Sequence, residues 1–457
     1  MQQANAASWT GRRAAQVKAV ILSTIFLVTF VTYARSPVTT STDSAWTLHL
    51  AASILREHNT NLDEYRPLMD LPVEYRVRIV DRHIYSYYPV ATPLLVTPAV
   101  WAVNKIYPLL YPTDFYTYLD QHAPDSRTAK LEKVLASGFA ALTAVLMYLI
   151  ARRELTIWKA LAVTFIFAFS TSMWSTASRA LWQHGPSALF LTAALLLLLM
   201  SSERPLLVFW VGLLLGFSYF IRPTNSLALG FIALYLLVNK RKQLWLYAAG
   251  VLLVLLPYVI ENWLTYHNPL PPYSYQLFER LSTPGVFGEA LEGTLISPAR
   301  GLFVWTPLFL FACYGAYLRL RGPAPFVRLD LYLAAIVVAH WIMTSLFEDW
   351  GGAWSIGPRY FVDVIPLLVY FLIPVLNSSI MAATAWRTAF IAAVLASTLI
   401  QYHCATSNYP FMWNGKPQAL VEAPQRKWDW GDLQFLRGFC PGNPLEGRAP
   451  ACWLGND

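Results

Sequence analysis

The sequence predicts an all-α polytopic membrane protein, and three observations support this fold class. Hydrophobic residues make up 56% of the 457 residues and charged residues only 13%, far from the averages of soluble domains. Apolar runs of bilayer-crossing length recur along the chain, from Val17–Ala34 to Thr388–Tyr402. Short basic stretches separate these runs. Together they indicate a bundle of about eleven transmembrane helices.

The expected spans follow one another from the N-terminus. The first, Val17–Ala34, has no convincing small-residue cleavage site and precedes many more spans, so we expect a retained signal anchor. The later spans are Val134–Ile150, Ile157–Thr176, Gly185–Met200, Pro205–Ile221, Pro223–Val238, Leu244–Val259, Gly301–Leu318, Leu329–Leu346, Tyr360–Leu376 and Thr388–Tyr402. The apolar stretch Pro89–Tyr111 is broken by prolines, and counting it as a span would invert every later loop. We expect a juxtamembrane or re-entrant element there, or half of a short hairpin.

Basic residues predict the orientation of the bundle, because short loops rich in Lys and Arg face the cytoplasm. The N-terminus and every basic cluster can lie inside together. These clusters are Arg12/Arg13/Lys18, Arg152/Arg153/Lys159, Lys240/Arg241/Lys242, Arg319/Arg321/Arg328 and Arg387. The net charge of +8 is spread over them, so it indicates topology and a preference for anionic membrane lipid, not nucleic-acid binding.

This orientation predicts the domain organisation. Residues 1–402 form one transmembrane domain with a first outer loop at 36–88 and a second at 263–300, and short juxtamembrane helices are expected in the first loop. Residues 403–457 form an extracytoplasmic tail. We expect a multi-pass protein of the cell membrane whose polar outer loops hold a reaction site, because charge at membrane depth is costly and is usually retained for function.

The cysteines agree with an oxidising outer compartment. Cys313 lies within an expected span and is predicted to be a core residue. Cys440 and Cys452 lie in the Pro/Gly-rich tail and are the favoured disulfide pair. No Cys/His spacing resembles a zinc site.

Asp43 is the first candidate for chemistry. It lies just after the first span, at the start of a segment, Thr42–Leu55, with apolar residues at roughly helical spacing. One interpretation is a helix cap, worth about 1 kcal/mol. The other is a catalytic base held at the membrane surface by a short amphipathic helix. The local pattern alone favours the cap.

Several short segments resemble GT-C-type glycosyltransferases, the polytopic enzymes that use polyprenyl-phosphate sugars and include protein O-mannosyltransferases and aminoarabinose transferases. Besides Asp43, the segments that carry the resemblance are Tyr85–Leu94, Arg179–Pro186, Ser297–Leu302 and Trp350–Tyr360. The resemblance implies a GT-C-like bundle in which Asp43 is the catalytic Asp. Many members carry Glu directly after that Asp, whereas this chain has Ser44.

The resemblance also implies a reaction. A sugar would pass from a polyprenyl-phosphate donor to a hydroxyl of a glycan, lipid or protein acceptor on the extracytoplasmic face. A lipid phosphate is a good leaving group, so the site needs a base for the hydroxyl and cations for the phosphate. Asp43 would supply the base, and Arg359, Arg222 and Arg300, in that order of preference, would hold the phosphate through charge-assisted hydrogen bonds.

Further residues are candidates for substrate or metal binding. Each also has a plainer interpretation as an aromatic-belt, interface or solvated residue. The substrate-binding candidates are Tyr87, Tyr88, Arg179, Trp182 and His184. Asp63 and Glu64, with Asp43, are candidates for a divalent cation such as magnesium or manganese, although no cofactor is required by the sequence.

Two other functions stay open from the sequence. A transporter would also have many spans, but here the charges gather at one face and no paired broken helices recur in two halves. A ligase or polymerase of lipid-linked glycans would share the lipid donor, yet it would depend on a large arginine-bearing outer loop with no Asp after the first span. The sugar and the acceptor are not indicated.

Overall fold

The structure, a computed structural model, describes residues 2–71, 73–274, 281, 284–321 and 327–439, and helices dominate it. In chain order the α-helices are α1 (Gln2–Arg35), α2 (Thr47–Arg56), α3 (Ala91–Ile106), α4 (Phe115–Gln121), α5 (Ser126–Ala151), α6 (Ile157–Phe169), α7 (His184–Met200), α8 (Leu207–Ile221), α9 (Ser226–Asn239), α10 (Leu244–Tyr266), α12 (Pro284–Ile296), α13 (Leu302–Trp305), α14 (Phe309–Arg321), α15 (Val327–Ser345), α16 (Ile365–Tyr370), α17 (Thr384–Thr406) and α18 (Tyr409–Met412). A π-helical turn, η3 (Met173–Ala177), and the 3₁₀ turns η1 (Asp63–Leu68), η4 (Pro223–Asn225) and η6 (Arg359–Val364) matter for the site.

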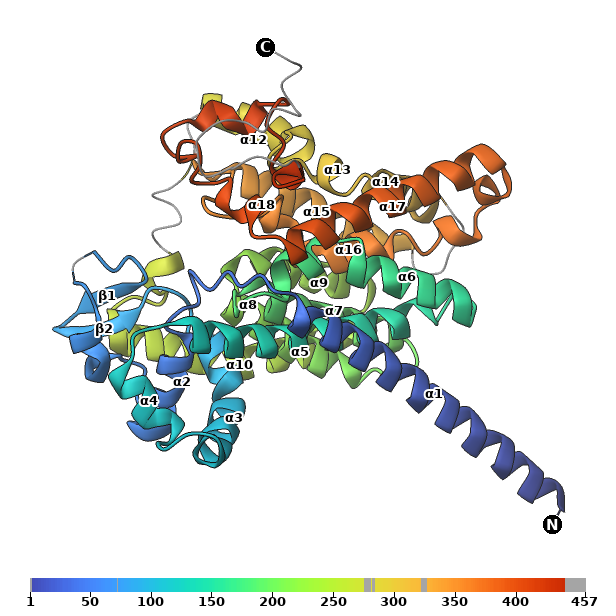
Figure 1. Cartoon of the computed structure of the whole chain (residues 1–457). Helices are drawn as coiled ribbons and strands as arrows, with labels where there is room; N and C mark the ends of the chain where they lie inside the picture. The colour runs from blue at the N-terminus through green and yellow to red at the C-terminus, as the bar shows by residue number, and fades with distance from the viewer. Residues whose placement is uncertain (1, 72, 275–280, 282–283, 322–326, 440–457) are drawn as a thin grey trace.

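The helices form two layers with a lobe at one end. In Figure 1, α5 and α7–α10 make up one layer, and α13–α17 lie across it. The lobe contains α2, α3, α4 and a β-hairpin, and it has its own hydrophobic core around buried Trp46, Leu48 and Tyr65. This lobe comes from the first outer loop and the segment that follows it, so short helices form there as the sequence predicts.

Within the described residues, five helices are long and apolar enough to cross a membrane, and five shorter apolar helices have 10–17 residues. These helices fit a multi-pass membrane protein. Every span expected from the sequence coincides with helical structure, but three of them are not continuous α-helix. Tyr360–Leu376 consists of η6, the six-residue α16 and a turn that leads into the 3₁₀ turn η7 (Val375–Asn377). Gly301–Leu318 breaks between α13 and α14 at Pro307, which lacks a backbone N–H and disfavours helix in the residue before it. Ile157–Thr176 breaks after Phe169 and resumes as the π-helical turn η3.

The α8–α10 pair shows how small residues bring the helices together. A Cβ atom on Gly212 would lie 2.1 Å from the Tyr247 carbonyl oxygen, and one on Gly250 would lie 2.1 Å from the Phe209 carbonyl oxygen. The two backbones therefore touch at these glycines. Close approach at small residues is typical of helix packing in membranes, where apolar burial does not favour helix association over contact with lipid.

The β-hairpin was not predicted. Strands β1 (Val77–Val80) and β2 (His83–Ser86) pair antiparallel with Val80 opposite His83. The two-residue loop, Asp81-Arg82, has φ angles of 49° and 71°, as a type I′ turn requires. The alternating pattern of Val77–Ser86 around an Asp-containing pair was the available signal.

The ambiguous stretch Pro89–Tyr111 contains the helix α3, which packs against α2. One face of α3 is exposed and apolar, with Leu94, Trp101 and Ile106 each more than two-fifths exposed. The stretch thus contributes a helix to the lobe.

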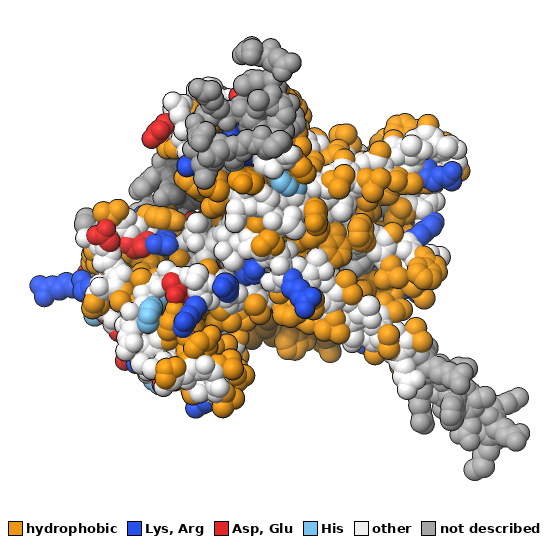
Figure 2. Space-filling model, in the orientation of Figure 1, with side chains coloured by type: hydrophobic (Ala, Val, Ile, Leu, Met, Phe, Trp, Pro, Cys, Tyr) orange, Lys and Arg blue, Asp and Glu red, His pale blue; other side chains and the backbone are white. Residues whose placement is uncertain are grey.

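The surface charge is uneven. On the face shown in Figure 2, acidic side chains gather over the end that carries the β-hairpin and the neighbouring upper part, whereas the opposite end shows only Lys and Arg. Apolar side chains cover much of the surface between. Lys and Arg side chains also appear at the end that carries the β-hairpin.

The structure corrects one cysteine prediction. Cys313 is exposed on the side of α14, because its helix buries the neighbouring Phe311 and Ala312 instead. Cys404 is buried. The expected pair Cys440 and Cys452 lies outside the described residues. The expected start of the tail at residue 403 falls inside α17, which continues to Thr406.

Candidate active site

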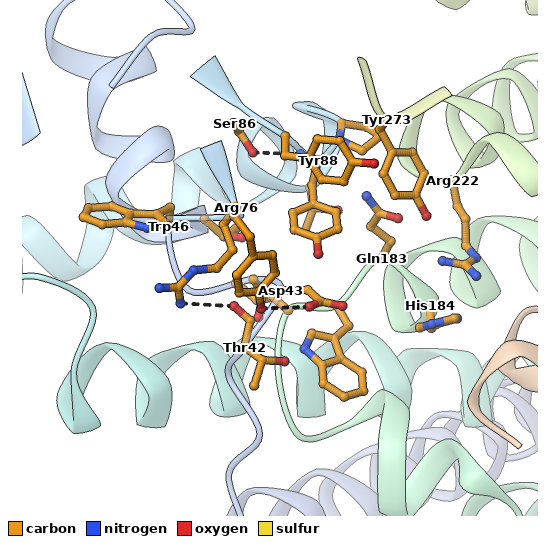
Figure 3. A pocket seen from close by; sticks show the side chains of 18 of the residues that line it. Thr42, Asp43, Trp46, Arg76, Ser86, Tyr88, Gln183, His184, Arg222 and Tyr273 are labelled. Carbon is orange, nitrogen blue, oxygen red and sulfur yellow. Dashed lines mark hydrogen bonds between the residues drawn. The ribbon is translucent and has the colours of Figure 1, made fainter. Parts of the chain in front are cut away.

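A cavity of about 440 Å³ opens where the lobe meets the two helical layers. Its walls come from six segments: the turn after α1, the β-hairpin and the start of α3, the segment before α7, the turn after α8, the second outer loop, and the stretch between α15 and η6. Figure 3 shows part of this lining, with Asp43 between Arg76 on one side and Arg222 and His184 on the other. Polar groups from distant parts of the chain therefore converge on one hollow.

Asp43 lies on the wall of this cavity and does not cap a helix. Helix α2 begins at Thr47, and its N-cap residue is Trp46, without a side-chain cap bond. The Asp43 carboxylate instead accepts hydrogen bonds from the Tyr75 hydroxyl at 3.2 Å and from Arg359 Nη1 at 3.3 Å. Its side chain is 26% exposed, so one edge stays open to the cavity. The capping interpretation is therefore wrong.

Arg359 forms an ion pair with Asp43 from the opposite side of the fold. The chain reaches it through Gly352 and Gly357, which have φ angles of 69° and 56° that other residues rarely adopt. The guanidinium stacks over the Trp182 ring, 5.1 Å from the centroid. Its Nε–H donates to no acceptor among the described residues. Arg359 thus holds Asp43 with one nitrogen and keeps donor capacity for a further anion.

A buried carboxylate, Asp363, organises the floor of the cavity. It accepts hydrogen bonds from Arg222 Nε and, at 3.1 Å, from His184 Nδ1, and His340 Nε2 lies 3.9 Å away. Asp363 is fully buried and sits one turn after Arg359 in η6. Arg222 and His184 line the cavity, whereas Asp363 does not. Asp363 therefore compensates the charge of Arg222 and orients its guanidinium without lining the cavity itself.

Tyrosines form another part of the cavity wall. The rings of Tyr87, Tyr88 and Tyr273 lie 5.3–5.7 Å from one another. Burial, followed by the charge of Asp43, raises the pKa of Tyr75 to about 12, so its hydroxyl stays a proton donor to Asp43 at neutral pH. Aromatic faces beside hydroxyl groups suit a ligand with both apolar and polar surfaces, such as a sugar ring.

Several predicted residues meet in this cavity. Those that line it are Asp43, Tyr87, Tyr88, Trp182, His184, Arg222 and Arg359. They come from parts of the sequence more than 300 residues apart, as the separation of 316 between Asp43 and Arg359 shows. The other predicted site residues lie elsewhere.

Arg300 is buried outside the cavity. All five of its N–H groups donate inside the protein, to the carbonyl oxygens of Gly351, Ala299 and Ala353 and to the side chains of Gln434 and Asn414. It ties the loop before Arg359 to the C-terminal segment. No donor is left for a phosphate, so the structure does not support the expected role of Arg300 in phosphate binding.

Arg179 is also buried away from the cavity. Its Nη1 donates to the carbonyl oxygens of Ser175 and Cys404, at 3.0 and 2.6 Å, and so joins η3 to α17. It does not line the cavity, and a role in substrate binding has no support from its position.

Asp63 and Glu64 are not brought to Asp43. Asp63 binds His83 and the Ile84 amide; although burial opposes the shift, these bonds lower the pKa of Asp63. Glu64 accepts a hydrogen bond from Ser53 at 2.6 Å, and burial raises its pKa. Within the described part of the chain no group of three His, Cys, Asp or Glu residues could hold a metal ion. The expected three-carboxylate magnesium or manganese site does not fit this arrangement.

Comparisons with known proteins identify the fold. No protein-family model matches the sequence, and no curated protein matches it. The fold is similar to the crystal structure of ArnT from Cupriavidus metallidurans bound to undecaprenyl phosphate, with a TM-score of 0.53 and 14% identity over 86% of this chain and 72% of that one. It is also similar to the Archaeoglobus fulgidus oligosaccharyltransferase tethered with an acceptor peptide, with a TM-score of 0.52 and 12% identity over 89% of this chain and 58% of that one.

The chain has the fold of GT-C glycosyltransferases. The resemblance predicted from short sequence segments is thereby confirmed for the fold. At such low identity the likeness says nothing of individual residues. The chain spans about three-fifths of the length of the archaeal enzyme, so the activity of that whole protein does not transfer directly.

Sequence reasoning missed important members of the site. Asp363 sits inside an expected apolar span, and an ionisable residue at membrane depth was the signal that could have found it. Tyr75, Arg76 and Arg78 lie in or beside the unpredicted β-hairpin, and Tyr273 lies in the second outer loop. Nothing in their local sequence shows that they face Asp43.

Proposed function

We propose that this chain is a membrane glycosyltransferase that moves a sugar from a polyprenyl-phosphate donor to an acceptor hydroxyl, with Asp43 as the general base. The observation that carries the proposal is the open carboxylate of Asp43, held by Arg359 on the wall of a cavity that also contains Arg222. The shared fold supports it, since one of the similar structures is bound to undecaprenyl phosphate.

The chemistry follows from the residues. The acceptor hydroxyl attacks the anomeric carbon, its proton passes to Asp43, and the bond from that carbon to the phosphate oxygen breaks. The phosphate leaves with the negative charge, which Arg359 and Arg222 stabilise. Arg359 lies beside both the base and the expected phosphate, so it sets the distance between the two reacting ends.

The site is proposed to face away from the cytoplasm. In Figure 2 the acidic side chains gather near the end that carries the β-hairpin, and the basic clusters of the sequence belong to other loops. Each of the roughly eleven predicted spans coincides with a helix or a broken helix, and we propose that they all cross or enter the bilayer. The shorter ones, such as the 13-residue α6, would reach only about 20 Å and need their irregular extensions to complete the crossing.

Lipid extracts of the native host test the function and identify the donor. Cells that lack the protein, or carry D43N, should accumulate a polyprenyl-phosphate sugar that mass spectrometry detects, and wild-type chain should remove it. Accumulation of a lipid-linked oligosaccharide would indicate a ligase or polymerase instead. An unchanged lipid profile in both strains would contradict a lipid-linked donor, and normal lipids in D43N alone would contradict the role of Asp43.

A further inference from the structure

Glu132 lies on α5 directly beneath the turn that carries Asp43. Its side chain is fully buried and does not line the cavity. Its Oε1 atom accepts a hydrogen bond from the Ser41 hydroxyl at 2.7 Å, and its Oε2 atom accepts one from the Ser44 hydroxyl at 2.5 Å. One carboxylate therefore holds residues on both sides of Asp43.

The same carboxylate also reaches a second wall of the cavity. The backbone N–H of Leu181 donates to Glu132 Oε2 at 3.5 Å. Leu181 itself lines the cavity and precedes Trp182, over which Arg359 stacks. Glu132 thus joins the turn that carries the base to the segment beneath its arginine partner.

The helix that presents Glu132 is well anchored. The Asp125 carboxylate accepts from the Thr128 amide at 3.0 Å, and the Thr128 hydroxyl accepts from the Asp125 amide at 2.8 Å, which makes a capping box at the start of α5. The neighbouring residue, Lys133, donates to the Ser36 carbonyl oxygen at 2.7 Å. Lys133 therefore holds the start, and Glu132 the end, of the segment that leads from α1 to Asp43.

Holding a turn with a buried carboxylate carries a large desolvation cost. Desolvation penalises the charge heavily unless hydrogen bonds compensate it, and an amide or a second hydroxyl would cost less. The hydroxyl of Ser44 reaches the carboxylate that α5 supplies.

We infer that Glu132 is a positioning residue that fixes the direction of the Asp43 carboxylate through Ser41 and Ser44. The inference rests on the proposed role of Asp43 as the base. Loss of the anchor lets the turn move while Arg222 stays in place, since Asp363 holds it. A displacement of about 1 Å at a reacting group can slow catalysis roughly a hundredfold.

The test compares E132A and E132Q with wild type in membranes of the native host. E132A should slow consumption of the accumulated lipid-linked donor about 10- to 100-fold, and E132Q, which keeps one acceptor oxygen, should lose less. Binding of undecaprenyl phosphate to the purified chain, read as a thermal shift, should change less than about twofold in affinity. D330N is the matched control, because Asp330 is a fully buried carboxylate bonded to Tyr370 and remote from the cavity lining.

A second comparison tests the route through the serines. S41A/S44A should slow transfer like E132A, and adding E132A to that pair should cost less than about threefold more, because linked residues are non-additive. This pair also carries the test if E132A does not fold. Three results would each overturn the inference. They are a wild-type transfer rate in E132A or in S41A/S44A, fully additive losses of rate when the changes are combined, and an equal loss of rate in D330N. Because D43N tests the base separately, an active D43N would instead refute the proposed function.

Discussion

The Nη1 atom of Arg359 lies 3.3 Å from the Oδ2 atom of Asp43, and both side chains line the same cavity. The pair is only partly exposed, with 14% and 26% of the two side chains accessible. In the resting site the arginine compensates the charge of the base. When a phosphate arrives, the same guanidinium has further N–H groups to offer it, so donor binding and base position are linked through one side chain.

Arg359 should therefore dominate donor binding. R359A should weaken binding of undecaprenyl phosphate by about 1.5–3 kcal/mol, the range for hydrogen bonds to charged groups. R359K should recover only part of this, because an ammonium cannot reproduce the fork of a guanidinium. Calorimetry in detergent micelles measures both. Wild-type affinity in R359A would remove this arginine from the phosphate site.

Asp363 should act on donor binding through Arg222. D363N keeps the shape of the side chain but removes the charge that holds Arg222 Nε. The variant should weaken undecaprenyl phosphate binding, and R222A/D363N should bind no more weakly than R222A alone, since contacting residues couple. Independent, additive losses in the double variant would show that Asp363 acts by another route.

Arg300 should matter for stability and not for the donor. R300A removes five buried hydrogen bonds and leaves the oxygens of Ala299 and Asn414 without another donor among the described residues, at a cost of about 1–3 kcal/mol for each unsatisfied group. The melting temperature should fall while the affinity for undecaprenyl phosphate in the folded fraction stays near wild type. A selective loss of donor affinity at unchanged melting temperature would return Arg300 to the phosphate site.

The orientation of the bundle can be tested with single cysteines. Val73 in the lobe is 74% exposed, and Arg241 lies in a basic turn between α9 and α10. In a background without the four native cysteines, V73C should react with a membrane-impermeant maleimide in intact cells, and R241C should react only after permeabilisation. The reverse pattern would place the cavity on the cytoplasmic side.

The helices were predictable because each apolar run has to satisfy its backbone internally at membrane depth, and helix is the local way to do so. The places where runs break depend on single prolines and on packing. Pro307 splits one expected span, and the turn after Phe169 splits another. Such breaks hardly change the hydropathy of a run, so the number of continuous membrane-crossing helices does not follow from hydropathy.

The site was predictable only in part, and Arg222 and Arg300 show why. Both are arginines close to a proline or glycine at the end of an expected span. In the fold, Arg222 reaches the cavity, whereas Arg300 finds five acceptors inside the protein. The difference lies in tertiary partners such as Asp363 and Gln434, which are 141 and 134 residues away. A local pattern carries no information about such partners.

The most direct measurement of the central claim is the transfer rate of D43N in membranes of the native host, measured beside its binding of undecaprenyl phosphate. Loss of a general base should slow transfer roughly 10²–10⁴-fold. Undecaprenyl phosphate should bind at least as tightly as to wild type, because Arg359 loses its competing carboxylate. Transfer within a few-fold of wild type by a folded D43N chain would contradict the account.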